Sequence, residues 1–188
     1  MNQSELVKQM SHKQLKQSLY MSQTIFLCVG IIVSVFLFDH LTSWFDYFKW
    51  DTKELFYYGV VPGLIVVAID IILMIFLPKR FYDDGGINEK LFKNSSIVDV
   101  FFISLIVAVS EEILFRGVLQ TVFGYFIAST IFALVHVRYL KKPVLLVSVL
   151  LLSFYIGYLF EVTGNLFVTM IAHFTIDFLL GLIIRFQK

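Results

Sequence analysis

The chain alternates between long apolar stretches and short polar connections. Six apolar stretches come close to the roughly 20 residues that an α-helix needs to cross a bilayer. We therefore predict an all-α fold, a polytopic transmembrane helical bundle of about six spans. The fourth span is short, so its helix is expected to be tilted, extended or shielded by its neighbours. The predicted spans are Ser22–Phe38, Tyr57–Leu77, Ile97–Phe123, Tyr125–Val137, Val144–Phe160 and Leu166–Ile184.

Turn-forming residues separate these stretches, because proline, glycine and small polar residues favour turns over helix interiors. The turn signals are Pro78, Asp83–Gly86, Gly124, Pro143 and Thr163–Asn165. Three segments follow from this pattern. Residues 1–21 form a predicted cytoplasmic N-terminal tail, either an interfacial helix carrying Leu6, Met10 and Leu15 on one face or a solvated tail. Residues 22–96 hold two spans with their loops, and residues 97–185 hold a core of four helices.

Composition supports a membrane protein. Of the 188 residues, 59% are hydrophobic and only 15% are charged, and the mean hydropathy is +0.84. Soluble domains are typically about 45–50% apolar and about 25% charged. The formal net charge of +1 argues against nucleic acid as a partner. The single cysteine, Cys28, cannot form a disulfide within the chain.

Lysine and arginine are distributed unevenly between the two sides of the predicted bundle. Twelve of the 15 lie before the first span, in the connections after the second and fourth spans, or after the sixth. The opposite side carries only Lys49 and Lys53, and Arg116 lies within a span. Because basic residues favour the cytoplasmic side of a membrane, both termini of this multi-pass cell-membrane protein are expected in the cytoplasm.

Several ionisable residues lie inside the predicted spans. Translocon-based scales assign a cost of about 2.5–3.5 kcal/mol to a charged residue at the centre of a membrane helix. Such residues therefore indicate a functional site among the helices unless they only pair with a neighbour. The ionisable residues within the spans are Asp70, Glu111, Glu112, Arg116, His136, His173 and Asp177.

Most of these side chains are predicted to share one depth and to face one another. With a rise of about 1.5 Å per residue, the first glutamate, both histidines and the last aspartate lie roughly 14–20 Å below the outer turns. Glu112 and Arg116 are four residues apart, as are His173 and Asp177, so each pair shares a helical face. A single membrane histidine commonly serves only as a hydrogen-bond partner between helices. Two histidines at the depth of a Glu–Glu pair favour a functional site in the cytoplasmic half of the membrane.

This set of residues suits the hydrolysis of an amide. Two carboxylates close together in a low dielectric do not both ionise easily, so one is expected to serve as a general base for water near neutral pH. A histidine can share that role, and a second histidine with a neighbouring acid can stabilise an oxyanion. Ser110 points to a different helical face and makes a poor nucleophile, and the chain has no H-E-x-x-H zinc helix. Zinc held by one glutamate and two histidines remains an alternative.

Three motifs resemble the signatures of a known family. The motifs are EEILFR at Glu111–Arg116, FALVH at Phe132–His136 and HFTID at His173–Asp177. In order and approximate spacing they resemble E-E-x-x-x-R, F-x-x-x-H and H-x-x-x-N/D of the CPBP intramembrane protease family, also called Abi. This family of CAAX proteases and bacteriocin-processing proteins includes the type II CAAX prenyl endopeptidases. The resemblance covers about Val98–Leu182, four of the six predicted helices.

The resemblance implies a role for each of the six residues. Glu111 would be the general base for water, with His136 assisting, and His173 and Asp177 would stabilise the oxyanion. Glu112 and Arg116 would shape the site and balance its charge. Asp177 departs from members with asparagine, because an aspartate donates a hydrogen bond only when protonated; it could instead orient His173 or contact a metal. The implied mechanism is glutamic-type, with a metal-dependent form as the alternative.

The resemblance also implies an intramembrane endopeptidase acting on membrane-associated peptides or proteins within the lipid bilayer. The short loops resemble bacterial members, which process peptides or confer immunity to bacteriocins, and prenylated CAAX tails would be substrates only in a eukaryotic setting. Two rival hypotheses remain. One is a non-catalytic immunity or scaffold protein of the same fold. The other is a proton- or ion-coupled transporter, against which the absence of an evident inverted repeat counts.

Overall fold

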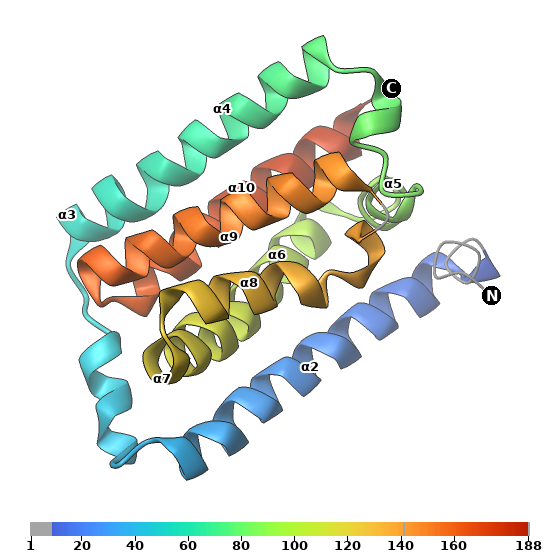
Figure 1. The fold of residues 1–188 in the computed structure, drawn as a ribbon. Helices are drawn as coiled ribbons and strands as arrows, with labels where there is room; N and C mark the ends of the chain where they lie inside the picture. Colours follow the sequence, from blue (N-terminus) through green and yellow to red (C-terminus); the bar gives the residue numbers. More distant parts are fainter. Residues whose placement is uncertain (1–8, 141, 188) are drawn as a thin grey trace.

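The protein is a bundle of long helices running side by side (Figure 1). The computed structural model describes residues 9–140 and 142–187, and all of the regular elements in these ranges are helical. The predicted all-α class is confirmed. The start of α2 and the end of α10 lie at the same end of the bundle, together with the connection from α4 to α6 (Figure 1). Leu6 and Lys8, which belong to the predicted N-terminal tail, lie outside the described ranges.

The N-terminal half supplies two long helices on opposite sides of the bundle, α2 and α4 (Figure 1). A capping box between Ser11 and Gln14 starts α2 ten residues before the predicted Ser22. Residues 12–21, predicted as part of a tail, are thus the first turns of the same helix as the first span. The elements of this half are α2 (His12–Leu37), η1 (Leu41–Tyr47), α3 (Thr52–Glu54), the π-helical η2 (Leu55–Val60), α4 (Val61–Phe76), η3 (Lys79–Phe81) and α5 (Ile87–Phe92).

The C-terminal half forms the centre of the bundle. Helix α6 starts at a second capping box, between Ser96 and Asp99, and runs without a break through a π-helical segment to Gly124, where φ of +87° ends it. Gly164, with φ of +56°, separates α9 from α10. The elements are α6 (Ile97–Glu112), the π-helical η4 (Ile113–Gln120), α7 (Thr121–Phe123), α8 (Tyr125–Val135), η5 (Val137–Tyr139), α9 (Pro143–Thr163) and α10 (Leu166–Phe186).

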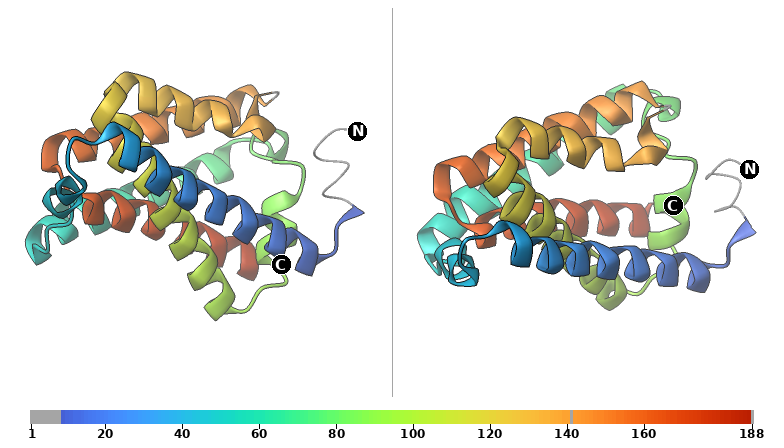
Figure 2. Two further views of the ribbon diagram at one scale, coloured as in Figure 1. Left: turned by 90° about the horizontal axis from the view of Figure 1, so that it is seen from below. Right: turned by 60° about the horizontal axis from the view of Figure 1, so that its bottom comes forward.

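Helix α10 is the hub of the packing. It contacts α6, α4, η2, α9 and α5, whereas α8 packs on α9 and η4, and α2 packs on α6 and η4. Two further views show α2 lying along one side of the bundle, at the α6–α7 stretch (Figure 2). Small residues allow the close approaches: a Cβ added to Gly63 would come within 2.8 Å of Thr175 on α10.

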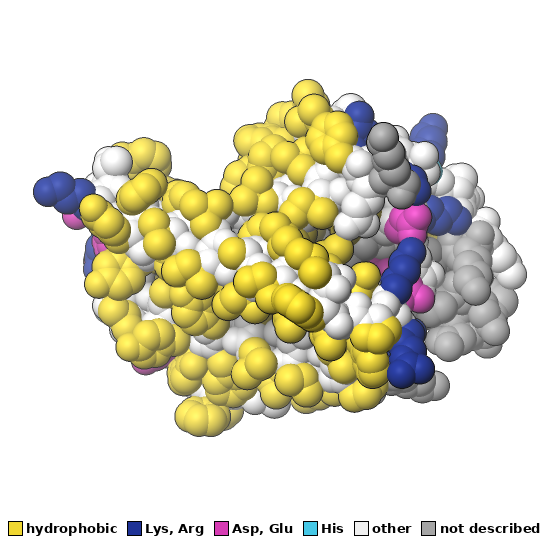
Figure 3. All heavy atoms as spheres, turned by 90° about the horizontal axis from the view of Figure 1, so that it is seen from above, with side chains coloured by type: hydrophobic (Ala, Val, Ile, Leu, Met, Phe, Trp, Pro, Cys, Tyr) yellow, Lys and Arg dark blue, Asp and Glu magenta, His cyan; other side chains and the backbone are white. Residues whose placement is uncertain are grey.

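Within residues 9–140 and 142–187, four helices are long and apolar enough to cross a membrane: residues 12–37, 52–76, 143–163 and 166–186. The third and fourth of the six predicted spans are not among these helices. The stretch Ile97–Phe123 carries the acidic pair, and α8 is only 11 residues long. Hydrophobic side chains cover the middle of the molecule while charged ones gather towards its ends (Figure 3). The chain is therefore a membrane protein.

Candidate active site

The two glutamates lie where α6 passes into η4. Glu111 and Glu112 end α6, and the π-helical turns of η4 carry Arg116. π-Helical segments inside longer helices occur frequently at functional sites. Glu112 is fully buried and Arg116 is 1% exposed, so both depend on partners inside the protein.

Glu112 joins two helices through its two oxygens. Its Oε1 lies 2.8 Å from Nδ1 of His173 on α10, and its Oε2 lies 3.3 Å from Nε of Arg116. Because a carboxylate oxygen accepts, Nδ1 of His173 is the donor in the first contact. Glu112 is thus held between a guanidinium and an imidazole in the interior.

Arg116 reaches two more helices. Its Nη2 donates to the backbone carbonyl of Ser153 on α9 at 2.9 Å, and lies 3.3 Å from the hydroxyl oxygen of the same residue. Its guanidinium carbon lies 4.5 Å from the centre of the Phe132 ring on α8, within the range of a cation–π interaction. Arg116 therefore links η4, α8 and α9 around the acidic pair.

His173 is placed between two carboxyl groups. Its Nδ1 contacts Glu112, and its Nε2 lies 3.5 Å from Oδ2 of Asp177 one turn later on α10. His173 is buried, whereas the Asp177 side chain is 31% exposed. The contacts form a continuous row from Arg116 through Glu112 and His173 to Asp177, with Asp177 at its open end.

His136 approaches this row from the end of α8, where it is the C-terminal cap residue. Its Nδ1 donates to the Phe132 carbonyl at 2.8 Å, because a carbonyl can only accept. In the neutral imidazole, Nε2 is then left as the acceptor. The Phe132 ring bridges the two histidines, with centroid distances of 4.9 Å to His136 and 6.1 Å to His173.

Tyr139 adds a neutral hydroxyl beside His136. The two rings stack at a centroid distance of 5.8 Å. Burial raises the pKa of Tyr139 above its usual value, the positive charge of Arg138 offsets part of this rise, and the negative charges of Asp84 and Asp177 add to it. The phenol therefore stays protonated at physiological pH. The sequence analysis missed this residue, which lies in η5 outside the predicted spans.

Glu111 has different surroundings from its neighbour. It is 4% exposed, and its Oε1 accepts a hydrogen bond from Nε2 of Gln23 on α2 at 3.1 Å. The oxygen of the same amide lies 2.6 Å from the hydroxyl oxygen of Ser110, which donates to it. Gln23 was not among the predicted site residues, although an amide inside the first predicted span is itself a signal of an interior partner.

Asp70 stands apart from the predicted set. It lies on α4, and within the described ranges it shares no hydrogen bond or ion pair with the six residues. In the parts of the chain that the structure describes, no three His, Cys, Asp or Glu side chains gather as a metal site would require.

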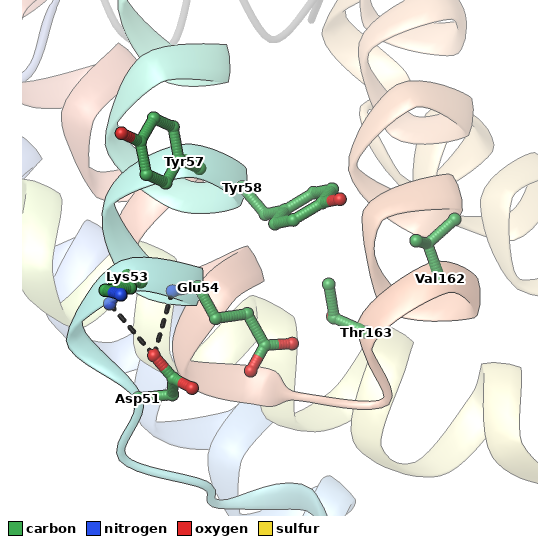
Figure 4. A pocket seen from close by; sticks show the side chains of 7 residues that line it. All are labelled: Asp51, Lys53, Glu54, Tyr57, Tyr58, Val162 and Thr163. Carbon is green, nitrogen blue, oxygen red and sulfur yellow. Dashed lines mark hydrogen bonds between the residues drawn. The ribbon is translucent and has the colours of Figure 1, made fainter.

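A hollow of about 390 Å³ (Figure 4) lies beside α3, at the end of the bundle opposite to the start of α2 and the end of α10 (Figure 1). The carboxylate of Asp51 accepts from the backbone N–H groups of Lys53 and Glu54 there, and Tyr58 points towards α9. None of the six predicted residues lines it. The lining residues are Asp51, Lys53, Glu54, Tyr57, Tyr58, Val162 and Thr163.

Comparison with known proteins identifies the family. A family model described as "Type II CAAX prenyl endopeptidase Rce1-like" matches residues 93–179. The chain is also 42% identical over 170 residues to a Bacillus subtilis (strain 168) protein named "Uncharacterized protein YpbD", covering 89% of this chain and 88% of the relative. The chain belongs to the Rce1-like family. No solved structure matches it.

Membership of the Rce1-like family, part of the CPBP proteases, assigns the chain to the CAAX-type intramembrane proteases at the family level. A peptide or protein substrate and membrane embedding follow from that assignment. The matched segment of this Rce1-like chain contains all six predicted site residues. It excludes α2 and α4, so Gln23 comes from outside it.

Proposed function

We propose that the chain is an intramembrane endopeptidase of the glutamic type, which hydrolyses peptide bonds of membrane-associated peptides or proteins. The observation that carries the proposal is the row Arg116–Glu112–His173–Asp177, buried except at Asp177, with a second carboxylate, Glu111, next to Glu112 in the chain. Residues from α6, η4 and α10 meet in this row although they lie far apart in the sequence. Ionisable groups that cluster inside a membrane bundle are taken to mark a functional site unless another role is shown.

The different contacts of Glu111 and Glu112 support different roles for the two residues. Both oxygens of Glu112 face cationic or N–H partners, so this residue balances charge and orients His173. Glu111 faces a neutral amide and is the general base. It takes a proton from water, and the resulting hydroxide bonds to the carbonyl carbon of the substrate peptide.

The histidines act on the oxygen atoms of the reaction. His136 presents Nε2 to the attacking water, because its Nδ1 is engaged by the Phe132 carbonyl. In the proposed step His173 is an imidazolium held between the carboxylates of Glu112 and Asp177, and it turns its Nε2 proton to the oxyanion. The proton on Glu111 then passes to the peptide nitrogen as the carbon–nitrogen bond breaks. This step releases a carboxylic acid and an amine and restores the Glu111 carboxylate.

In the proposed orientation, the protein lies in a bacterial cell membrane and both of its termini are in the cytoplasm. The lysine-rich connections lie at the same end of the bundle as the start of α2 and the end of α10 (Figure 1). This arrangement supports the proposed orientation, because basic residues favour the cytoplasmic side of a membrane. The proposed steps use no metal ion, and Glu112, His173 and Asp177 are paired with one another.

The test is cleavage of a library of membrane-associated peptides by the full chain reconstituted in liposomes. Mass spectrometry of the products is expected to show new peptide termini that require folded protein and persist with a chelator. Loss of cleavage on chelation would refute the glutamic mechanism. Binding of peptides without cleavage would refute the protease and favour a non-catalytic binding protein.

A further inference from the structure

Helix α2 delivers a buried amide to the candidate site although it lies outside the segment matched by the family. Gln23 is 7% exposed and lies between Ser22 and Thr24, just before the long apolar stretch of α2. Burying an amide without partners is costly, and both ends of this amide are used at the acidic pair. Its nitrogen donates to Glu111 and its oxygen accepts from Ser110.

We propose that Gln23 is a positioning residue for Glu111, so that docking of α2 is a condition of activity. The proposal rests on the proposed function of Glu111 as the general base. A hydrogen bond from a neutral donor to a carboxylate favours its charged form, which is the form that accepts a proton. The bond also fixes Oε1 of Glu111 and thereby sets the direction of its other oxygen.

Ser110 allows the hydrogen bond between Gln23 and Glu111 to form whether Glu111 is charged or protonated. The hydroxyl oxygen of Ser110 lies 2.6 Å from the Gln23 oxygen and 2.7 Å from the carbonyl of Ile106, but it has one hydrogen to donate. While Glu111 is charged, the Gln23 nitrogen faces it and Ser110 donates to the amide oxygen. When Glu111 holds a proton, the amide can turn over, accept from Glu111 and donate to Ser110. The Ser110 hydrogen then goes to Ile106.

Close packing holds α2 at this place. A Cβ on Gly30, two turns after Gln23, would lie 3.3 Å from the Ile113 side chain and 3.4 Å from the Leu114 Cα of η4. Between them Phe26 packs edge-on against Phe115, with centroids 5.9 Å apart. These contacts pack α2 closely against η4 on the same side of the helix bundle as the Gln23 contact.

The first test is the pH profile of cleavage by Gln23→Leu, which keeps the size but removes both polar ends. We expect kcat/KM to fall by about tenfold to a hundredfold, the range for losing a hydrogen bond to a charged group. The loss should be in kcat, and the acidic limb of the profile should move to higher pH. In Gln23→Glu the limb should move further, because a like charge then faces Glu111.

The matched control is Gln120→Leu. Gln120 is equally buried, at 3%, but its amide donates to the Gly157 carbonyl and to Glu161 on α9. Its loss is expected to lower the thermal stability and leave the pH profile in place. If Gln23→Leu behaves like this control, Gln23 is only a packing residue and the proposal is wrong.

A second measurement separates this proposal from the proposed function. A hydrophobic carbodiimide reacts with protonated carboxyl groups, so the pH midpoint of its labelling at Glu111, followed by mass spectrometry, needs no substrate. We expect a higher midpoint in Gln23→Leu and an unchanged one in Gln120→Leu. Equal midpoints in both variants would overturn the role of Gln23 even if the protein cleaves peptides. A raised midpoint without any cleavage would support the pairing and refute the protease.

Discussion

Glu112 and Arg116 show how a charged pair can be accommodated inside a membrane bundle. The pair is one helical turn apart, and α8, α9 and α10 supply further contacts, whereas Nη1 of Arg116 has no hydrogen-bond partner among the described residues. Removing one member of a buried pair leaves an uncompensated charge, which costs more than the pair itself contributes. The stability of the site therefore depends on Glu112 more than on Glu111, whose partner is neutral.

The change Glu112→Gln is expected to lower the free energy of unfolding by about 3–5 kcal/mol, because it leaves the Arg116 guanidinium without its counter-charge in the interior. Thermal unfolding of the purified variants in detergent measures this. Glu111→Gln is the control, since it exchanges a group that faces only an amide. Equal midpoints for the two variants would contradict the assignment of the charge-balancing role to Glu112.

Arg116→Lys tests the geometry of the same pair at constant charge. A lysine ammonium lacks the planar fork that reaches both Glu112 and the Ser153 carbonyl, so this substitution is not conservative here. We expect a lower unfolding temperature than for Arg138→Lys, where the guanidinium is partly exposed and 3.8 Å from Asp84. An unchanged unfolding temperature in Arg116→Lys would show that the fork is dispensable.

At the level of elements, the site depends on where helices end and how closely they approach. α6 continues into η4 so that the acids and Arg116 share one helix, whereas α8 ends at Val135 and leaves His136 at its terminus. α10 brings His173 to Glu112 because α4, α6 and α9 pack around it. Small residues set these distances.

Gly63→Val is expected to separate α4 from α10 and to cost about 1–3 kcal/mol, the usual range for overpacking. A Cβ there would already meet the Thr175 side chain at 2.8 Å and the Ala172 carbonyl at 3.0 Å. Ala68→Val, at an exposed position of the same helix, is the control and should leave the unfolding temperature unchanged. Equal stability of the two variants would mean that α4 is free to move.

Sequence patterns predicted the elements better than the contacts between them. Gly124, Pro143 and Gly164 mark helix ends because their backbone chemistry is local. Spacing by four residues likewise predicted the pairs within one helix. Contacts between helices are not local, so the partner of His173, which is Glu112, and the amide from α2 could not be read from the sequence.

For the whole molecule, the distribution of charge supports the proposed orientation. The apolar middle separates the ends of the bundle, where the charged side chains gather (Figure 3). The lysine-rich connections adjoin the ends of α2 and α10, and the opposite end carries the hollow beside Lys53. In the proposed orientation, substrates are cleaved near the inner leaflet.

Single-cysteine labelling tests this orientation. Cys28 is unpaired and exposed, so it is first replaced by serine. A membrane-impermeant maleimide added to intact cells is expected to label Lys53→Cys, and to label Lys93→Cys only after permeabilisation. The reverse pattern would place both termini outside the cell and contradict the proposed orientation.

The most direct test of the central claim is the turnover of one cleaved peptide by the wild type and by Glu111→Gln in matched liposomes. We expect kcat to fall by about 10²–10⁴, the range for losing a general base, while the unfolding temperature stays at the wild-type value. Turnover at the wild-type rate by folded Glu111→Gln protein would contradict the assignment of Glu111 as the base that activates water.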